Sequence, residues 1–377
     1  MTTTPTTSPR ATDTQAMSCR AMSSQAMSPR ATSSQARSTP STVRQLRRQR
    51  QRQRRRIIAL LLCALLAGVC LTLMLGQSWI DPATVIAVLS GEQVPGASFT
   101  LMELRLPRAL IAVLAGACFG LGGAAFQTML RNPLASPDVI GISAGASAAA
   151  VFAIVMLSLR GAPVALVAIV GGLGVALLIY ALSWRRGVAD TRLILTGIGL
   201  AAMLQSAIAY LLTQAPAWPL QEAMRWMTGS LNSVHLDQSL PLLLALVVLG
   251  LPLLHFARDL EAMRLGDDMA RGLGVRLSLT RLGIVVAAVG LVAFATAVTG
   301  PIAFVAFLSG PVAAWLIRHN GSVLIPAAMV GALFVLLGDF IGQHLLPARY
   351  PVGVVTGVIG APYLITLVMR DNARGST

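Results

Sequence analysis

Ten apolar stretches alternate with short polar segments along this chain. They cover residues 57–76, 107–130, 138–159, 163–183, 192–214, 240–257, 282–300, 302–317, 323–345 and 352–369. A helix of about 20 residues crosses the hydrocarbon layer of a bilayer, which is about 30 Å thick. Because backbone groups in that layer must be hydrogen-bonded within the segment, each stretch is predicted to be a transmembrane α-helix.

Composition supports the same interpretation. Hydrophobic residues make up 55% of the 377 residues and charged residues only 11%, whereas soluble domains carry about 25% charged residues. This balance argues against a secreted domain or a soluble enzyme. It favours an all-α polytopic membrane protein with ten transmembrane helices.

The distribution of charge predicts the orientation of these helices. All 29 basic residues are arginine, and the net charge is +15. Twelve precede Ile57, twelve more fall in connections assigned to the inside, and five fall in connections assigned to the outside. Basic residues gather on the cytoplasmic side of membrane proteins, so both termini are predicted to be cytoplasmic. Because the arginines flank apolar runs and form no single patch, nucleic acid is not an expected partner.

The first 56 residues differ from the rest of the chain. A ten-residue unit rich in Ser, Thr and Ala occurs three times, and it carries no aliphatic face that could build a core. We therefore expect a disordered tail, followed by an arginine-rich cytoplasmic anchor that could also contact anionic membrane lipid. A ten-helix domain over 57–370 and a short cytoplasmic tail over 371–377 complete the predicted organisation.

Two segments carry more charge than a membrane helix needs. Arg105 and Arg108 share one helix face at the outer edge of the second helix, where arginine runs against the charge bias. They could bind acidic groups of an external partner or lipid headgroups. On the inside, the loop 258–281 could form a short helix interrupted at Gly272 or Gly274, with an apolar side that binds a cytoplasmic partner or the membrane. Its length and mixed charge favour the partner.

Residues that could perform chemistry are few. The four histidines are scattered without the spacing of metal ligands, so we predict no metal site and no cofactor bound by this chain. It also lacks a phosphate-binding loop, so it cannot bind ATP by such a motif of its own. Asp339 is the one carboxylate deep inside an apolar stretch, which makes it a candidate for function or for internal hydrogen bonding. Trp218 and Trp226 fit an interfacial aromatic belt.

Several ordered motifs resemble those of a known family. They are RLPRALIAVLAGACFGLGGAAFQTMLRNPLASPDVIGISAGAS from Arg105, WMTGSL from Trp226, LGDDMARGLGV from Leu265, GPIAFVAF from Gly300 and PVGVVTGVIGAPYLI from Pro351. These runs, spread over residues 57–370, resemble the permeases of ABC importers for iron chelates (ferric siderophores), haem and vitamin B12. The resemblance implies a type II importer fold with ten helices. It also implies a second permease subunit, two ATPase subunits that use ATP and Mg, and a periplasmic or lipid-anchored substrate-binding protein.

The resemblance also assigns expected roles to residues. Arg105 and Arg108 match arginines that dock the binding protein. A third docking arginine of some relatives is replaced here by Gln343, and His344 or Arg349 could substitute for it. The loop that seats in the ATPase is matched by Leu265, Gly266, Asp267, Arg271, Leu273 and Gly274. Arg131, Asn132 and Pro133 form a cytoplasmic turn. A Pro-His pair that follows the GPIAFVAF-like run in many relatives is missing.

The expected function is therefore that of a non-enzymatic transport subunit in the bacterial inner (plasma) membrane. Ferric siderophores are the commonest cargo in such a family, and vitamin B12 and haem stay open as alternatives. The competing hypothesis is a secondary transporter driven by an ion gradient. Such a transporter requires paired acids at the membrane midplane and internal repeats, whereas this chain offers the single Asp339 and no clear repeat.

Overall fold

The structure is a computed structural model that describes residues 40–375, except 77, 139–140, 184–189, 233 and 319. The chain divides into two units, Met1–Leu46 and Arg47–Thr377. Of the first unit, the structure describes only the helical residues from Pro40 onward. The predicted repeat tail, Arg185, Arg186 and His319 lie outside the described residues. The following description concerns the second unit.

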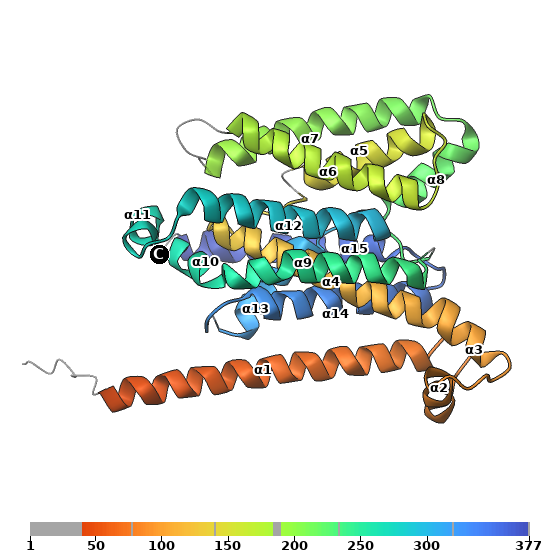
Figure 1. Ribbon diagram of the computed structural model, residues 1–377, viewed down its shortest axis with the longest axis horizontal. Helices are drawn as coiled ribbons and strands as arrows, with labels where there is room; N and C mark the ends of the chain where they lie inside the picture. Colours follow the sequence, from red (N-terminus) through yellow and green to blue (C-terminus); the bar gives the residue numbers. More distant parts are fainter. Residues whose placement is uncertain are drawn as a thin grey trace, which may run out of the picture. The chain divides into compact units, whose positions relative to one another are not determined.

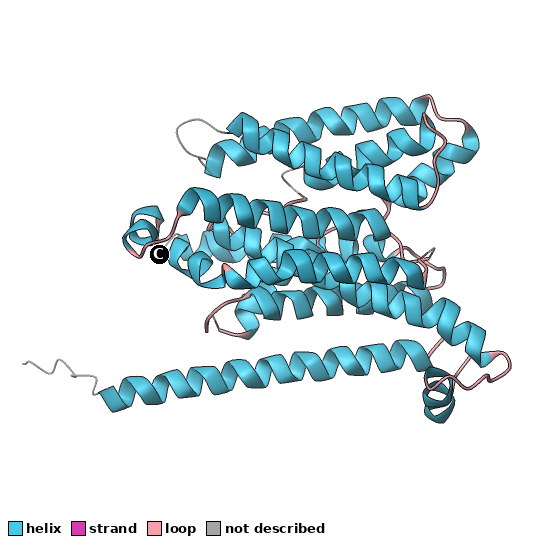
Figure 2. Cartoon of the chain, in the orientation of Figure 1, coloured by secondary structure: helices cyan, strands magenta, loops and turns pink. Residues whose placement is uncertain are grey.

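Every regular element in the described part of the chain is helical, as Figure 2 shows. The elements are α1 (Pro40–Met74), α2 (Pro82–Leu89), α3 (Ala97–Phe99), a π-helical turn (Thr100–Arg105), α4 (Leu106–Met129), α5 (Ile142–Val155), α6 (Ala162–Ser183), α7 (Asp190–Thr213), α8 (Ala217–Met227), a 3-10 turn (Leu236–Gln238), α9 (Ser239–His255), α10 (Ala257–Met263), α11 (Asp267–Gly272), α12 (Leu277–Thr299), α13 (Val305–Leu316), α14 (Leu324–His344) and α15 (Val352–Gly375). Figure 1 shows their order.

The predicted transmembrane helices are confirmed. Among the described residues, seven helices are long and apolar enough to cross a membrane, and three shorter apolar helices, α5, α13 and α15, bring the total to ten. The sequence did not predict α2, α3 or α8, which are short and lie in the connections. The loop 258–281 forms two short helices, α10 and α11, with left-handed glycines at Gly266 and Gly274 marking the breaks.

The helices differ sharply in burial. α4 packs against α9, α12, α13 and α14. The most apolar part of Ala97–Met129, the segment that contains α4, is 83% buried, and that of α12 is 72% buried. α1 and α7 are only 17% buried, and Leu60 and Leu195 are more than half exposed. Most apolar side chains of these two helices therefore face outward, and such a surface requires a lipid or protein environment rather than water. The exposed faces of these outer helices therefore agree with a polytopic membrane protein.

Glycine allows α4 and α14 to approach closely. A Cβ placed on Gly116 would lie 2.4 Å from the carbonyl oxygen of Gly331, and one placed on Gly331 would lie 2.2 Å from the carbonyl oxygen of Gly116. Both distances are far inside van der Waals contact. The small-residue spacing in the second predicted helix thus serves helix packing, as expected for membrane helices.

Two helices extend beyond the predicted membrane segments. Residues 40–56, which include the predicted arginine-rich anchor, form the N-terminal part of α1. Arginine and glutamine are good helix formers, and a proline at the first helical position favours helix initiation, so the polar block continues the membrane helix. At the other end, α15 runs to Gly375 through most of the predicted tail.

Candidate functional site

The residues singled out by sequence lie at the two ends of α4. Arg108 lies in its first turn and Arg131 immediately follows its last residues. Because α4 has 24 residues, these ends are about 36 Å apart. Two separate polar regions therefore frame one apolar helix, an outer one around Arg108 and an inner one around Asp267.

The outer region is centred on an ion pair between α4 and α14. The Arg108 guanidinium donates from Nε to Asp339 Oδ2 at 2.5 Å and from Nη2 to Asp339 Oδ1 at 2.7 Å. The Asp339 side chain is 4% exposed and the Arg108 side chain 20% exposed. This two-point geometry is the strongest form of arginine–carboxylate contact. The intramembrane acid therefore has an internal ion-pair and hydrogen-bonding role.

The same guanidinium holds the connection after α8. Arg108 Nη2 donates to Asn232 Oδ1 at 2.8 Å, and Gln343 Nε2 donates to the same oxygen at 3.2 Å. Backbone hydrogen bonds also link this connection to the end of α12, from Ser230 N to Thr299 O, and to the start of α15. The stretch from Trp226 to Asn232, attributed to the interfacial belt from sequence, thus joins four helices at this end.

Arg105 does not point outward as expected. Its side chain is buried, and its guanidinium donates to the carbonyl oxygens of Leu73, Met74 and Ser78 at 2.7–3.0 Å. The last carbonyls of a helix have no partner within the helix, and a buried cation is a favourable one. Arg105 therefore closes the C-terminal end of α1.

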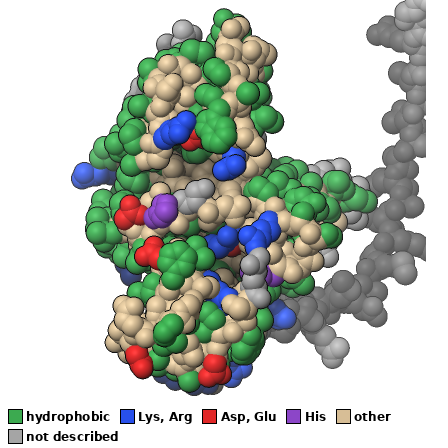
Figure 3. Space-filling view, turned by 90° about the vertical axis from the view of Figure 1, so that its right-hand side faces the viewer, with side chains coloured by type: hydrophobic (Ala, Val, Ile, Leu, Met, Phe, Trp, Pro, Cys, Tyr) green, Lys and Arg blue, Asp and Glu red, His purple; other side chains and the backbone are tan. Residues whose placement is uncertain are grey.

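Arg349 is exposed, in the connection between α14 and α15. Figure 3 looks onto this end of the molecule and shows arginine side chains near the middle of the face, with hydrophobic side chains around them. Of the three predicted docking arginines, Arg349 is thus exposed, Arg108 is partly exposed and Arg105 is buried.

The inner region is organised by Asp267, the first residue of α11. Arg281 Nη2, from α12, donates to both carboxylate oxygens of Asp267 at 3.0 Å, and Arg131 Nη2 lies 3.5 Å from Oδ1. Gly266, with φ of +107°, makes the turn that presents this carboxylate. One acid therefore ties the α10–α11 loop to α12 and to the end of α4.

The same loop presents an apolar face that the described residues do not cover. Leu265, Met269 and Leu273 are 64%, 61% and 64% exposed. Met269 and Leu273, four residues apart, share one side of α11. Arg271 pairs with Asp268 at the exposed surface, at 3.1 Å, and Gly274, with φ of +87°, ends the motif. A clamped backbone that carries three exposed large apolar side chains is the geometry expected of a protein contact.

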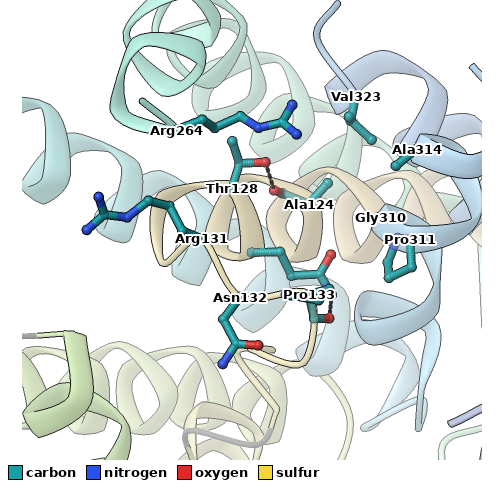
Figure 4. A pocket seen from close by; sticks show the side chains of 11 residues that line it. Ala124, Thr128, Arg131, Asn132, Pro133, Arg264, Gly310, Pro311, Ala314 and Val323 are labelled. Atoms are coloured by element: carbon teal, nitrogen blue, oxygen red, sulfur yellow. Dashed lines mark hydrogen bonds between the residues drawn. The ribbon is translucent and has the colours of Figure 1, made fainter. Parts of the chain in front are cut away.

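The predicted turn after α4 borders a cavity of about 370 Å³. Figure 4 shows it between the end of α4, Arg264 and α13. Gln127 forms part of its lining and donates to the carbonyl oxygens of Pro133 and Phe307, both at 2.9 Å. Asn132 Oδ1 accepts from the backbone N–H of Leu134, which fixes the turn. The remaining lining residues are Ala124, Thr128, Arg131, Gly310, Pro311, Ala314 and Val323.

Asp138 lies further along the connection between α4 and α5. Ser143 Oγ donates to its Oδ1, while its Oδ2 is buried without a hydrogen-bond partner among the described residues. Burial disfavours the charged form and raises the pKa of Asp138 to about 6, although the Ser143 hydrogen bond lowers it in part.

Three of the polar residues that organise these regions were not singled out by sequence: Asn232, Gln127 and Arg281. Gln127 had a usable signal, because it is an isolated polar side chain within an apolar stretch. Asn232 and Arg281 had none. The partners of Asn232 are 124 and 111 residues away, the partner of Arg281 is 14 residues away, and no local pattern points to either contact.

The fold is that of a polytopic helical membrane protein, with an apolar body, a polar region at each end of α4 and an exposed apolar loop at one end. The chain belongs to the FecCD transport family, which it matches over residues 64–370.

Individual relatives agree with this assignment. The chain is 36% identical over 324 residues to the ferric enterobactin transport system permease protein FepG of Escherichia coli (strain K12), covering 84% of this chain and 97% of FepG. It is 31% identical to the vitamin B12 import system permease protein BtuC of Salmonella typhi, covering 86% and 98% of the two chains. A solved structure described as an inward-facing metal-chelate type ABC transporter superposes with a TM-score of 0.75 at 25% identity, covering 84% and 99%.

Proposed function

We propose that this chain is the membrane-spanning permease subunit of an ATP-driven importer for ferric siderophores. The observation that carries the proposal is the α10–α11 loop, whose backbone is held by Asp267 and whose apolar side chains face outward. The names of FepG and of the iron(3+)-hydroxamate permease FhuG of Bacillus subtilis (strain 168), 33% identical, support iron chelates as cargo. Vitamin B12 and haem are the alternatives.

The proposed mechanism is alternating access without covalent chemistry in this chain. Two ATPase subunits, which bind ATP and Mg, seat the face formed by Leu265, Met269 and Leu273. When they close, force passes through Asp267 to α12 and α4, because both helices hold this carboxylate through arginine. A second permease subunit completes the pathway, and the helix pair reopens on the opposite side.

The binding protein is proposed to dock at the outer end, through Arg349 and the accessible side of Arg108. The hydrogen bonds of Arg108 use Nε and Nη2, which leaves Nη1 for an acidic side chain of the partner. Arg105 contributes indirectly by fixing the end of α1. Arg349→Glu should weaken association with the binding protein. The loss should be larger at low salt, because salt screens exposed charge pairs and reduces their contribution to binding.

The proposed location is the bacterial inner membrane with both termini in the cytoplasm. The arginine distribution supports this orientation, since the α10–α11 loop and residues 48–56 of α1, both in the second unit, share one end of it (Figure 1). Reporter fusions after Arg370 should therefore give a cytoplasmic signal.

The central experiment is uptake of a radiolabelled ferric siderophore into proteoliposomes that contain the complete complex. Uptake should require ATP and be blocked by vanadate, whereas a secondary transporter would respond to an ion gradient instead.

A variant of the α10–α11 loop tests whether its exposed apolar face binds the ATPase. Leu273→Asp places an unpaired charge in the ATPase contact, so the ATPase should no longer co-purify and uptake should fall at least ten-fold. Leu157→Asp, at a comparably exposed leucine of the other end, is the control and should retain the ATPase. If Leu273→Asp leaves co-purification and uptake unchanged, the loop does not transmit the ATPase motion.

A further inference from the structure

A stripe of four arginines runs along the first turns of α1. Arg48, Arg52, Arg55 and Arg56 are all exposed, and at about 100° per residue they fall within an arc of about 100° around the helix. We call these four residues the arginine stripe. The sequence alone suggested an anchor that sets orientation and could contact anionic lipid, and the transport scheme gives these four side chains no further role.

The arginine stripe faces away from the helical bundle. On the opposite side of α1, Arg54 Nη2 donates to the carbonyl oxygen of Ser322 at 3.0 Å, and Gly68 lies against α14. On the side of the stripe, Leu60 and Leu66 are 69% and 57% exposed. In a membrane these outward leucines contact lipid tails, so the stripe continues the lipid-facing side of α1 beyond the hydrocarbon.

The height of the stripe matches the headgroup layer. Ile57–Met74 rise by about 27 Å, close to the hydrocarbon thickness of about 30 Å. Arg55 and Arg56 therefore lie at the hydrocarbon boundary, Arg52 about 6 Å beyond it and Arg48 about 12 Å beyond it. The headgroup region is about 5–7 Å thick on each side, and long arginine side chains can reach back toward it.

The stripe also needs anions that the protein does not supply. α1 contains no acidic residue, and within the part of the chain that the structure describes, none of the four arginines has an ion-pair partner. Guanidinium groups bind phosphate through paired hydrogen bonds. We propose that the arginine stripe binds the phosphates of anionic phospholipids in the leaflet at the N-terminal end of α1.

This proposal requires only that α1 crosses a bilayer, so it stands independently of the cargo and of the ATPase contact. Matched double variants test it in the purified full-length chain. Arg52→Gln/Arg56→Gln removes two charges from the stripe, and Arg50→Gln/Arg54→Gln removes two charges from the opposite side at nearly the same height. Glutamine preserves the helix propensity.

Native mass spectrometry, with titration of phosphatidylglycerol or phosphatidylcholine into delipidated protein, gives the affinities. At about 1 kcal/mol for each basic residue near an anionic surface, the stripe variant should bind phosphatidylglycerol about thirty-fold more weakly. The opposite-side variant should change less than three-fold, and binding of phosphatidylcholine should not change. Arg52→Lys/Arg56→Lys, which keeps the charge, should recover most of the binding.

Three results would overturn the proposal. Equal losses in the two glutamine variants would mean that only total charge matters. Displacement of phosphatidylglycerol by inorganic phosphate at similar concentration would mean a free-anion site. Unchanged phosphatidylglycerol binding by the stripe variant would mean that the stripe does not bind lipid, and loss of the ATPase from a purified complex that carries this variant would then assign the stripe to a protein partner.

Discussion

The ion pair between Arg108 and Asp339 is predicted to stabilise the outer end of the fold. Arg108→Gln removes three hydrogen bonds of 2.5, 2.7 and 2.8 Å and leaves a carboxylate that is 4% exposed without its cation. Breaking a buried ion pair from one side costs about 3–5 kcal/mol. Because the Arg108 side chain is 20% exposed, water offsets part of this cost, and we expect about 3 kcal/mol.

A change on the other side of the ion pair isolates the coupling free energy between Arg108 and Asp339. Asp339→Asn keeps one acceptor oxygen but turns an amide N–H toward the guanidinium, which should cost about 2 kcal/mol. In the double variant Arg108→Gln/Asp339→Asn two neutral side chains face each other, and no charge is left buried alone. The double variant should therefore be more stable than the sum of the single losses implies, by at least about 2 kcal/mol.

The assay is unfolding in mixed micelles with increasing SDS, followed by circular dichroism on all four proteins. Arg349→Gln, an exposed arginine of the same end, is the control and should change the free energy of unfolding by no more than about 0.5 kcal/mol. If the two single variants are additive within about 0.5 kcal/mol, the pair carries no coupling energy and the outer end is held by apolar packing instead.

Three further predictions concern other parts of the fold. Gly331→Ala should lower the free energy of unfolding by about 1–3 kcal/mol, because its Cβ would meet the backbone of α4. Gly174→Ala, where a Cβ has open space, is the control and should be neutral in the same assay. Equal effects of the two variants would contradict the close approach of α14 to α4. Arg105→Gln should loosen the end of α1, seen as faster proteolysis between α1 and α2 at unchanged membrane insertion; wild-type cleavage rates would show that the three carbonyl contacts are dispensable. Burial raises the pKa of Asp138 to about 6, above the pKa of an aspartate in the unfolded chain. The folded state therefore binds more protons between about pH 4 and 6, and its stability should fall as pH rises through this range. Asp138→Asn should abolish this pH dependence in SDS titrations, and a pH dependence that persists would assign it to another group.

Much of the architecture followed from local pattern. Each predicted apolar stretch became a helix in the structure, because a chain in lipid must hydrogen-bond its own backbone wherever apolar residues run long enough. The α10–α11 loop was also recognisable, since its glycines and its four-residue apolar spacing are neighbours in sequence. The helical state of the arginine-rich anchor was not predicted, because polar residues carry no hydropathy signal, whereas arginine and glutamine continue an established helix readily.

The sequence by itself determined that this protein is a helical membrane protein with ten apolar segments, because length and hydropathy act residue by residue, and its ordered motifs gave the resemblance to a permease family. Only the tertiary structure decided what the polar side chains do. Arg108 meets Asp339 across 231 residues, while Arg105, three positions earlier, turns to carbonyls of α1. The sequence predicts both arginines on one helix face, but a buried guanidinium is stable only where a carboxylate or carbonyl oxygen lies within hydrogen-bond distance. That group is set by which helices pack together and at what height, which no local pattern specifies.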